Sequence, residues 1–209
     1  MKRLVATLAL TAVGMTPALA ETIKVGIAND SSGPFAAVGA EISDGINLAI
    51  KMLDGKLGGH PAEFLQQDMA GNPDQARQLV NRYIQRDKID FFTCPVGSNV
   101  ALAVGPALFK AEVPFLTSNP GPSQLAGSQC NPYFFAVSYQ NDSFHEAAGK
   151  VASDRDYKKV FILAPDYPAG KDALNGFKRG YGQTPSEEIY TKLGQIDYAA
   201  ELAQIRANK

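Results

Sequence analysis

The sequence predicts an α/β protein whose parallel sheets are flanked by helices. Short apolar runs typical of buried strands alternate with amphipathic segments of helical period along nearly the whole chain. With 45% hydrophobic and 20% charged residues, the chain can bury a core and is not of disordered composition. Strands joined by crossover helices run parallel, so we expect parallel sheets that are covered on both faces.

Residues 1–20 have the pattern of a secretory signal peptide. Lys2 and Arg3 precede an apolar run at 4–15, and a small-residue A-x-A motif ends at Ala20. The run is shorter than the roughly 20 residues of a membrane-spanning helix, which disfavours a membrane anchor. We therefore predict cleavage after Ala20 and a mature protein in the periplasm.

A first series of strand–helix steps is expected between residues 21 and 138. The predicted strands are 23–28, 61–67, 89–93, 113–117 and 133–137, and the predicted helices are 42–53, 73–84 and 99–111. Asn72 at an N-cap and Pro73 at the first helical position are a strong start signal for the second helix. Gly58 and Gly59 end the first helix. These elements are assigned to a first lobe.

A second series begins near residues 138–141 and is assigned to a second lobe, 139–209. Its predicted strands are 159–164 and 187–193, and its predicted helices are 141–153, 170–181 and 197–209. The last helical segment reaches Lys209 without a closing strand. We therefore expect the second lobe to be incomplete and the first lobe, 21–138, to lack its C-terminal return.

Charge and motif patterns disfavour several function classes. Removing residues 1–20 takes two of the 20 Lys and Arg and leaves 18 against 21 Asp and Glu, a net charge of −3 that disfavours nucleic-acid binding. Pro165 and Asp172 replace the Gly and the Ser or Thr of a phosphate-binding loop. His60 and His145 have no partner at metal-ligand spacing. We predict a protein that is not an enzyme and uses no metal or cofactor.

The chain has two cysteines, Cys94 and Cys130. Their separation lies outside the C-x-x-C spacing of redox motifs, and an exported protein can keep a disulfide. The sequence leaves open whether the two residues pair.

Small and polar residues follow the first, third and fourth predicted strands. Phe35 ends the first of these loops, Ser98 and Asn99 end the second, and Asn119 and Gly121 lie in the third. The carboxyl ends of parallel strands share one edge of a sheet, and ligands bind at the loops there. Ser98 and Asn99 also begin a helix, whose free N–H groups favour an anion such as a carboxylate. We predict ligand contacts at these five positions.

Each of the three loops also has an alternative structural role. Ser98 or Asn99 can serve only as the N-cap of its helix, Gly121 can shape a turn, and Phe35 can pack in the core. The convergence of three loops on one sheet edge favours ligand binding. Tyr167 follows the first strand of the second lobe and is a candidate contact from the opposite wall of the crevice, where a ring with a hydroxyl suits a closing contact.

In their order and spacing, several segments resemble the type I periplasmic binding proteins of ABC importers, in the leucine/isoleucine/valine-binding branch. The segments are Ile23-Lys24-Val25-Gly26, Ser32-Gly33-Pro34, Gln67-Asp68, Asn72-Pro73, Gly97-Ser98-Asn99, Val113-Pro114-Phe115, Gly121-Pro122-Ser123, Cys130-Asn131-Pro132 and Asp166-Tyr167-Pro168. Together they extend over residues 21–209. The resemblance implies two α/β lobes that are joined by three crossing segments and close on a small ligand by a hinge.

The resemblance also implies roles for the candidate residues. Ser98 matches the serine whose hydroxyl meets the ligand carboxylate, and Asn119 and Gly121 match the loop that holds the carboxylate and ammonium. Tyr167 lies two positions before the family's tyrosine, where this chain has Ala169. The leucine-type loop favours Ala-Ala-Thr where this chain has Asn119-Pro120-Gly121, which is more similar to the branch that takes aromatic acids or other small carboxylates.

The function implied by the resemblance is a monomeric receptor for a small amino acid or an aromatic or other carboxylate. It would deliver this ligand to the permease of an ABC importer. Two alternatives stay open, namely a ligand-sensing module of the same fold that docks onto a regulator, and a truncated gene product without activity.

Overall fold

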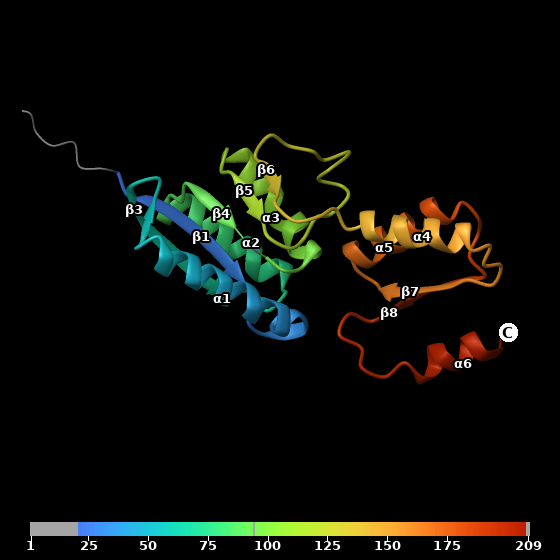
Figure 1. Cartoon of the computed structure of the whole chain (residues 1–209). Coiled ribbons are helices and arrows are strands. Elements are labelled where there is room, and N and C mark those ends of the chain that lie inside the picture. Colours follow the sequence, from blue (N-terminus) through green and yellow to red (C-terminus); the bar gives the residue numbers. More distant parts are fainter. Residues whose placement is uncertain (1–20, 94, 208–209) are drawn as a thin grey trace, which may run out of the picture.

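The computed structural model describes residues 21–93 and 95–207, which form two α/β lobes (Figure 1). The first lobe contains β1 (Ile23–Asn29), a 3₁₀ turn (Gly33–Phe35), α1 (Ala36–Met52), β2 (Lys56–Leu57), β3 (His60–Asp68), α2 (Pro73–Arg82), a π-helical turn (Tyr83–Asp87), β4 (Phe91–Thr93), α3 (Ser98–Lys110), β5 (Phe115–Thr117) and β6 (Phe134–Ala136). The second lobe contains α4 (Ser143–Asp154), β7 (Phe161–Pro165), α5 (Pro168–Tyr181), β8 (Glu187–Thr191) and α6 (Ala199–Ala207).

The order of the strands places the loops that were predicted to bind ligand at one edge. The first sheet has the order β2-β3-β1-β4-β5-β6, and the second pairs β7 with β8. All neighbouring strands run parallel except β2 and β3. From β1 the chain crosses to β3 on one side and then to β4 on the other, so the strand order reverses at β1. In open parallel sheets, a binding crevice lies outside the carboxyl ends of the strands at such a reversal.

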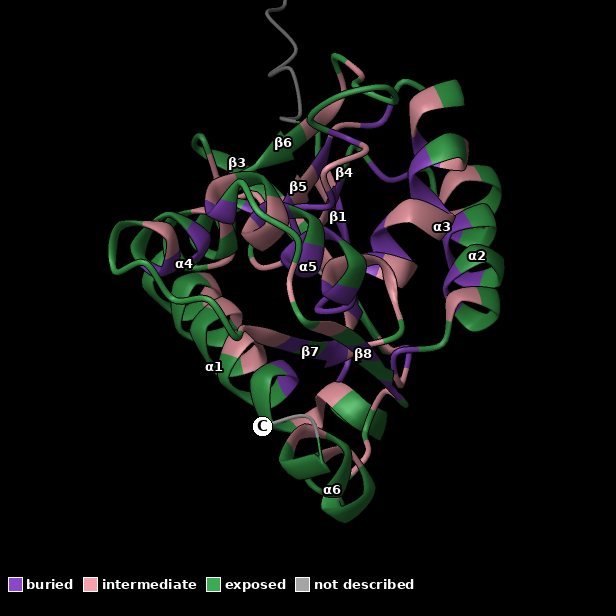
Figure 2. Cartoon of the chain, turned by 90° about the vertical axis from the view of Figure 1, so that its right-hand side faces the viewer, coloured by how far each residue is buried: buried purple, intermediate pink, exposed green. Residues whose placement is uncertain are grey.

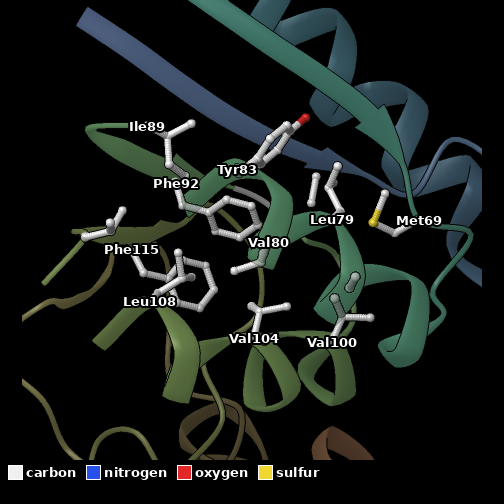
Figure 3. Close-up of a cluster of buried hydrophobic side chains, with 14 residues drawn as sticks. Met69, Leu79, Val80, Tyr83, Ile89, Phe92, Val100, Val104, Leu108 and Phe115 are labelled. Carbon is white, nitrogen blue, oxygen red and sulfur yellow. The ribbon is translucent and has the colours of Figure 1, made fainter. Parts of the chain in front are cut away.

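The core of the first lobe lies on both faces of its sheet. On one face, α2 and α3 pack against β4 and β5, where Phe92, Phe115 and Leu108 are fully buried (Figure 3). On the other face, Val25 and Ile27 of β1 pack against α1. Side chains alternate between the faces of a strand, so β1 contributes to both clusters. Figure 2 shows α2 and α3 with buried residues toward the sheet and exposed residues outward.

Each predicted strand and helix is present among the described residues, and the prediction of a mostly parallel α/β fold is confirmed. The ends of several elements differ. Helix α1 begins at Ala36, before the predicted start at residue 42. Its first turns carry no buried apolar side chain, because the buried residue there is Gly39, where a Cβ would overlap the backbone of Asp30. A pattern of apolar residues therefore could not reveal these turns.

One feature of the first sheet was not predicted. Strands β2 and β3 form a hairpin whose turn, Gly58 and Gly59, has φ angles of 58° and 87°. Residues with a Cβ rarely adopt such angles, whereas two glycines suit a tight hairpin turn. The helix-free connection between strands 113–117 and 133–137 is confirmed, since residues 118–133 form turns and no helix, and β5 and β6 are parallel.

Residues 137–142 connect β6 to α4 and thereby link the two lobes. The predicted domain boundary at residue 138 stays a prediction. The signal peptide, residues 1–20, and Cys94 lie outside the described residues, so cleavage after Ala20 and the pairing of Cys94 with Cys130 also stay predictions. Cys130 is exposed. Within 21–93 and 95–207, none of the helices has both the length and the apolar character that a membrane span requires.

Candidate functional site

Asp30 joins three loops at the carboxyl edge of the first sheet. It follows β1 directly and is 0% exposed. Its carboxylate accepts hydrogen bonds from the backbone N–H of Gly71, after β3, and of Val96, after β4, both at 2.8 Å. Hydrogen bonds to a buried carboxylate are strong, so these loops are held in fixed positions. Sequence reasoning missed Asp30; the available signal was an acidic residue immediately after a buried strand.

The ring of Phe35 covers the loops after β3 and β4. A Cβ on Gly97 would lie 2.6 Å from this ring, and a Cβ on Gly71 would lie 2.9 Å from it. Both distances are too short for carbon atoms, so the two glycines leave the space that the ring occupies. Phe35 is half-buried and lies outside the main hydrophobic clusters of the described residues, which favours a role at the edge of the site over core packing.

The N-cap of α3 is Gly97, and the alternative that Ser98 or Asn99 caps this helix is wrong. Both residues already lie inside the helix, where their side chains make longer-range bonds. The Ser98 hydroxyl accepts a hydrogen bond from Asn141 Nδ2 at 3.0 Å, and Asn99 donates one to the carbonyl of Gly71 at 3.3 Å. These side chains therefore join α3 to other parts of the site.

Asn119 and Gly121 belong to the loop after β5. Asn119 Nδ2 donates to the carbonyl of Val96 at 3.0 Å, which fastens this loop to the one after β4. Gly121 exchanges two hydrogen bonds with Asn141: its N–H donates to Asn141 Oδ1 at 3.2 Å, and its carbonyl accepts from the Asn141 N–H at 2.8 Å. A Cβ at Gly121 would overlap the carbonyl oxygen of Tyr139, so only glycine permits this close approach to the linking segment.

Asp172 of α5 connects the second lobe to this loop. It is 4% exposed, and its carboxylate accepts from the N–H of Ser123 and from Asn141 Nδ2, both at 3.0 Å. Gln124 Nε2 donates to its other oxygen at 3.4 Å. Asn141 and Asp172 thus form a buried junction between the lobes. Sequence reasoning considered Asp172 only as a departure from a phosphate-binding loop and missed Asn141, because their partners are distant along the chain.

Tyr167 approaches the first lobe from the opposite side. It is the N-cap residue of α5, and its ring centroid lies 6.0 Å from that of Phe35 with the planes tilted by 43°. Burial raises the pKa of the Tyr167 hydroxyl, which keeps it protonated and able to donate a hydrogen bond. Tyr167 also lines a cavity of about 300 Å³, together with Tyr139, Asn141 and His145.

The predicted site residues therefore fall into three pairs. Phe35 and Tyr167 contact each other across the two lobes. Ser98 and Gly121 do not contact each other through a described hydrogen bond, but both bond to Asn141. Asn99 and Asn119 hold neighbouring loops through backbone carbonyls. Ligand contact by any of the six residues stays a prediction.

A larger hollow of about 460 Å³ lies away from these residues. Ile23, His60 and Phe91, which begin β1, β3 and β4, contribute to its lining. Polar side chains fix the orientation of a bound ligand, and this lining is predominantly apolar. We therefore place the candidate site at the carboxyl edge. Among residues 21–93 and 95–207, no group of three or more His, Cys, Asp or Glu is arranged to hold a metal ion.

Two lobes with mostly parallel sheets, joined by buried polar contacts at the carboxyl ends of the strands, have the architecture of a two-lobe solute-binding protein. The family model described as "Periplasmic binding protein" matches residues 22–209, and the chain belongs to this family. The resemblance to the binding proteins of ABC importers is therefore confirmed.

Curated relatives carry leucine/isoleucine/valine-binding names. Leu/Ile/Val-binding protein homolog 6 of Brucella abortus (strain 2308) is 27% identical over 211 residues, which cover 99% of this chain and 54% of that protein. BraC3 of Rhizobium johnstonii is 25% identical over 214 residues, covering 100% of this chain and 58% of that protein. The chain spans about half the length of the curated relatives it matches.

Similar solved structures include solute-binding proteins of ABC transporters. One from R. palustris, in complex with benzoate, is 27% identical with a TM-score of 0.83. The match covers 90% of this chain and 53% of that chain. Another from R. palustris, in complex with 4-hydroxybenzoate, is 30% identical with a TM-score of 0.80, covering 90% and 52%. LivJ of Streptococcus pneumoniae, in complex with isoleucine, is 22% identical with a TM-score of 0.77 and shares the fold.

Proposed function

We propose that this chain captures a small aromatic carboxylate in the periplasm and presents it to the permease of an ABC importer. The observation that carries the proposal is the approach of Phe35 and Tyr167 from opposite lobes, with ring centroids 6.0 Å apart, above loops held by buried hydrogen bonds. Two rings carried by separate lobes can receive a flat ligand between them when the lobes open, because aromatic rings pack favourably in tilted or offset contacts.

The two buried carboxylates near the site already accept hydrogen bonds from protein donors, which disfavours a ligand with an ammonium group. Asp30 and Asp172 are buried acidic residues at this edge, and both accept hydrogen bonds from N–H donors. An ammonium group would have to compete with those donors for the carboxylates. Solute-binding proteins 27% and 30% identical to this chain hold benzoate and 4-hydroxybenzoate, which carry a ring and a carboxylate and no amine.

A branched-chain amino acid is the second candidate. The names of the curated relatives from Brucella and Rhizobium support it, since both are called leucine/isoleucine/valine-binding proteins. Under either candidate the chain acts as a monomeric receptor and catalyses no reaction.

Calorimetric titration of the native gene product, expressed whole, tests the proposal. Benzoate and 4-hydroxybenzoate should bind with micromolar affinity, about −8 kcal/mol. Cyclohexanecarboxylate, which keeps the carboxylate and loses the aromatic ring, should bind more weakly. Tighter binding of L-leucine or L-isoleucine than of either benzoate would favour the second candidate, and binding of none of these compounds would overturn both.

Substitution of the rings provides a matched test. Phe35→Leu keeps an apolar side chain and removes the ring, so the affinity for benzoate should fall by about 0.5–1.5 kcal/mol. Phe109→Leu removes a ring that packs near Phe134 in the first-lobe core and serves as the control for ring loss in general. Equal effects of the two substitutions on benzoate affinity would contradict the role of Phe35.

A further inference from the structure

Both polar atoms of the Asn141 side chain form hydrogen bonds. It lies in the segment that links the lobes and is 7% exposed. Its Nδ2 donates to Ser98 Oγ and to Asp172 Oδ2, each at 3.0 Å, and its Oδ1 accepts from the N–H of Gly121 at 3.2 Å. One amide therefore connects α3, the loop after β5 and α5.

The chemistry of the partners fixes which way this amide points. A carboxylate that accepts the Ser123 N–H must face the NH₂ side of Asn141, and the N–H of Gly121 must face its oxygen. The reversed amide would place its oxygen against the Asp172 carboxylate and its NH₂ against the Gly121 N–H. Asp172 and Gly121 thus determine that the second N–H of the amide is directed at Ser98.

This arrangement determines what the Ser98 hydroxyl can offer. A hydroxyl that accepts a hydrogen bond from Asn141 keeps its own hydrogen available for donation. Among the residues that the structure describes, no hydrogen bond donated by Ser98 Oγ is found. A hydroxyl held as a donor suits an anionic oxygen, because hydrogen bonds to a carboxylate are shorter and stronger than neutral ones.

We propose that Asn141 is a positioning residue that holds the Ser98 hydroxyl as a hydrogen-bond donor to the ligand carboxylate, and that Asp172 fixes the orientation of Asn141. This inference rests on the proposed function, since it requires a carboxylate ligand. Ser98 is 2% exposed, so a ligand reaches its hydroxyl when the lobes separate. Asn141 lies in the segment that connects the two lobes, so a hinge motion between the lobes bends the chain in its neighbourhood.

A double-mutant cycle on the native gene product, expressed whole, tests this inference, with benzoate, 4-hydroxybenzoate, L-leucine and L-isoleucine as the probes. All four probes carry a carboxylate. Asn141→Ala should weaken binding of whichever probe the unmodified protein binds by roughly five- to tenfold, because the donor hydrogen of Ser98 is no longer held in place. In a Ser98→Ala background, the same substitution should change affinity by less than about twofold, since its effect acts through that hydroxyl.

Two further variants separate positioning from general damage. Asn175→Ala changes an exposed asparagine of α5 and should leave affinity unchanged in both backgrounds. Asp172→Ala keeps Asn141 but removes the acceptor that orients it, so it should weaken binding in the same direction and again only where Ser98 is present. Asp172→Ala also replaces Asn141→Ala as the test variant if circular dichroism shows that Asn141→Ala does not fold.

The outcomes distinguish the two proposals. If the unmodified protein binds a probe and the losses are equal with and without Ser98, the positioning role is wrong while the proposed function stands. If the unmodified protein binds none of benzoate, 4-hydroxybenzoate, L-leucine and L-isoleucine, the proposed function fails and this inference fails with it. A loss of binding that occurs when Ser98 is present and not in the Ser98→Ala variant supports the inference.

Discussion

Replacement of Asp30 by Asn tests whether this carboxylate holds the candidate site together. The substitution keeps the size of the side chain and changes one oxygen to NH₂. In the native protein both oxygens accept backbone N–H groups at 2.8 Å, from Gly71 and Val96. The amide oxygen can keep one of these bonds, but its NH₂ group must face the other N–H, which is then buried without an acceptor.

The expected cost follows from these contacts. A hydrogen bond to a charged group contributes about 1.5–3 kcal/mol, and an orphaned buried donor costs about 1–3 kcal/mol. Removal of a buried negative charge offsets part of this loss. We therefore expect Asp30→Asn to lower the free energy of unfolding by about 2–4 kcal/mol.

Urea unfolding followed by far-UV circular dichroism measures this loss. Asp44→Asn is the matched control, because Asp44 lies exposed on α1 and surface substitutions usually stay within about 0.5 kcal/mol. A loss for Asp30→Asn that does not exceed that of the control would refute the reasoning. It would mean that the loops after β3 and β4 keep their positions without this carboxylate.

Three other substitutions follow from the structure. Gly121→Ala places a Cβ against the carbonyl oxygen of Tyr139, and urea unfolding should show a loss of about 1–3 kcal/mol. Asn72 caps α2 by accepting two backbone N–H groups, so Asn72→Ala should cost about 1 kcal/mol in the same assay, and no change would contradict the cap. Burial raises the pKa of Tyr83 from 10.0 to about 12, so the unfolded chain loses this proton first and stability falls as pH rises through that range. Urea midpoints measured between pH 9 and 12 should therefore fall less steeply for Tyr83→Phe; equal slopes would contradict the burial effect.

Local signals predicted the elements of the fold. Asn72 and Pro73 marked the start of α2, and its apolar residues at helical spacing are the ones that pack in the core, including Leu79 and Val80. Such signals work because helix caps and amphipathic faces depend on residues only a few positions apart. The first turns of α1 escaped detection because their buried residue, Gly39, has no apolar side chain.

The candidate site was predicted less completely than the fold. The alternation of strands and helices correctly indicated that the loops with Phe35, Ser98 and Asn119 lie at one edge of a parallel sheet. It did not reveal Asp30 or Asn141 as the residues that connect these loops. A polar residue in a loop has the same local pattern whether it faces solvent or lies buried among partners that are distant in the sequence.

The sequence by itself determined the α/β class, the order of the main strands and helices, and the sheet edge at which the candidate loops lie. These properties follow from periodicity and from the rule that parallel strands end together. Only the tertiary structure decided that Asp172 reaches the loop containing Ser123, that Asn141 bonds to Ser98, and that Phe35 meets Tyr167. Hydrogen bonds and ring contacts of this kind act over a few ångströms in space, and a linear pattern does not specify which distant residues come that close.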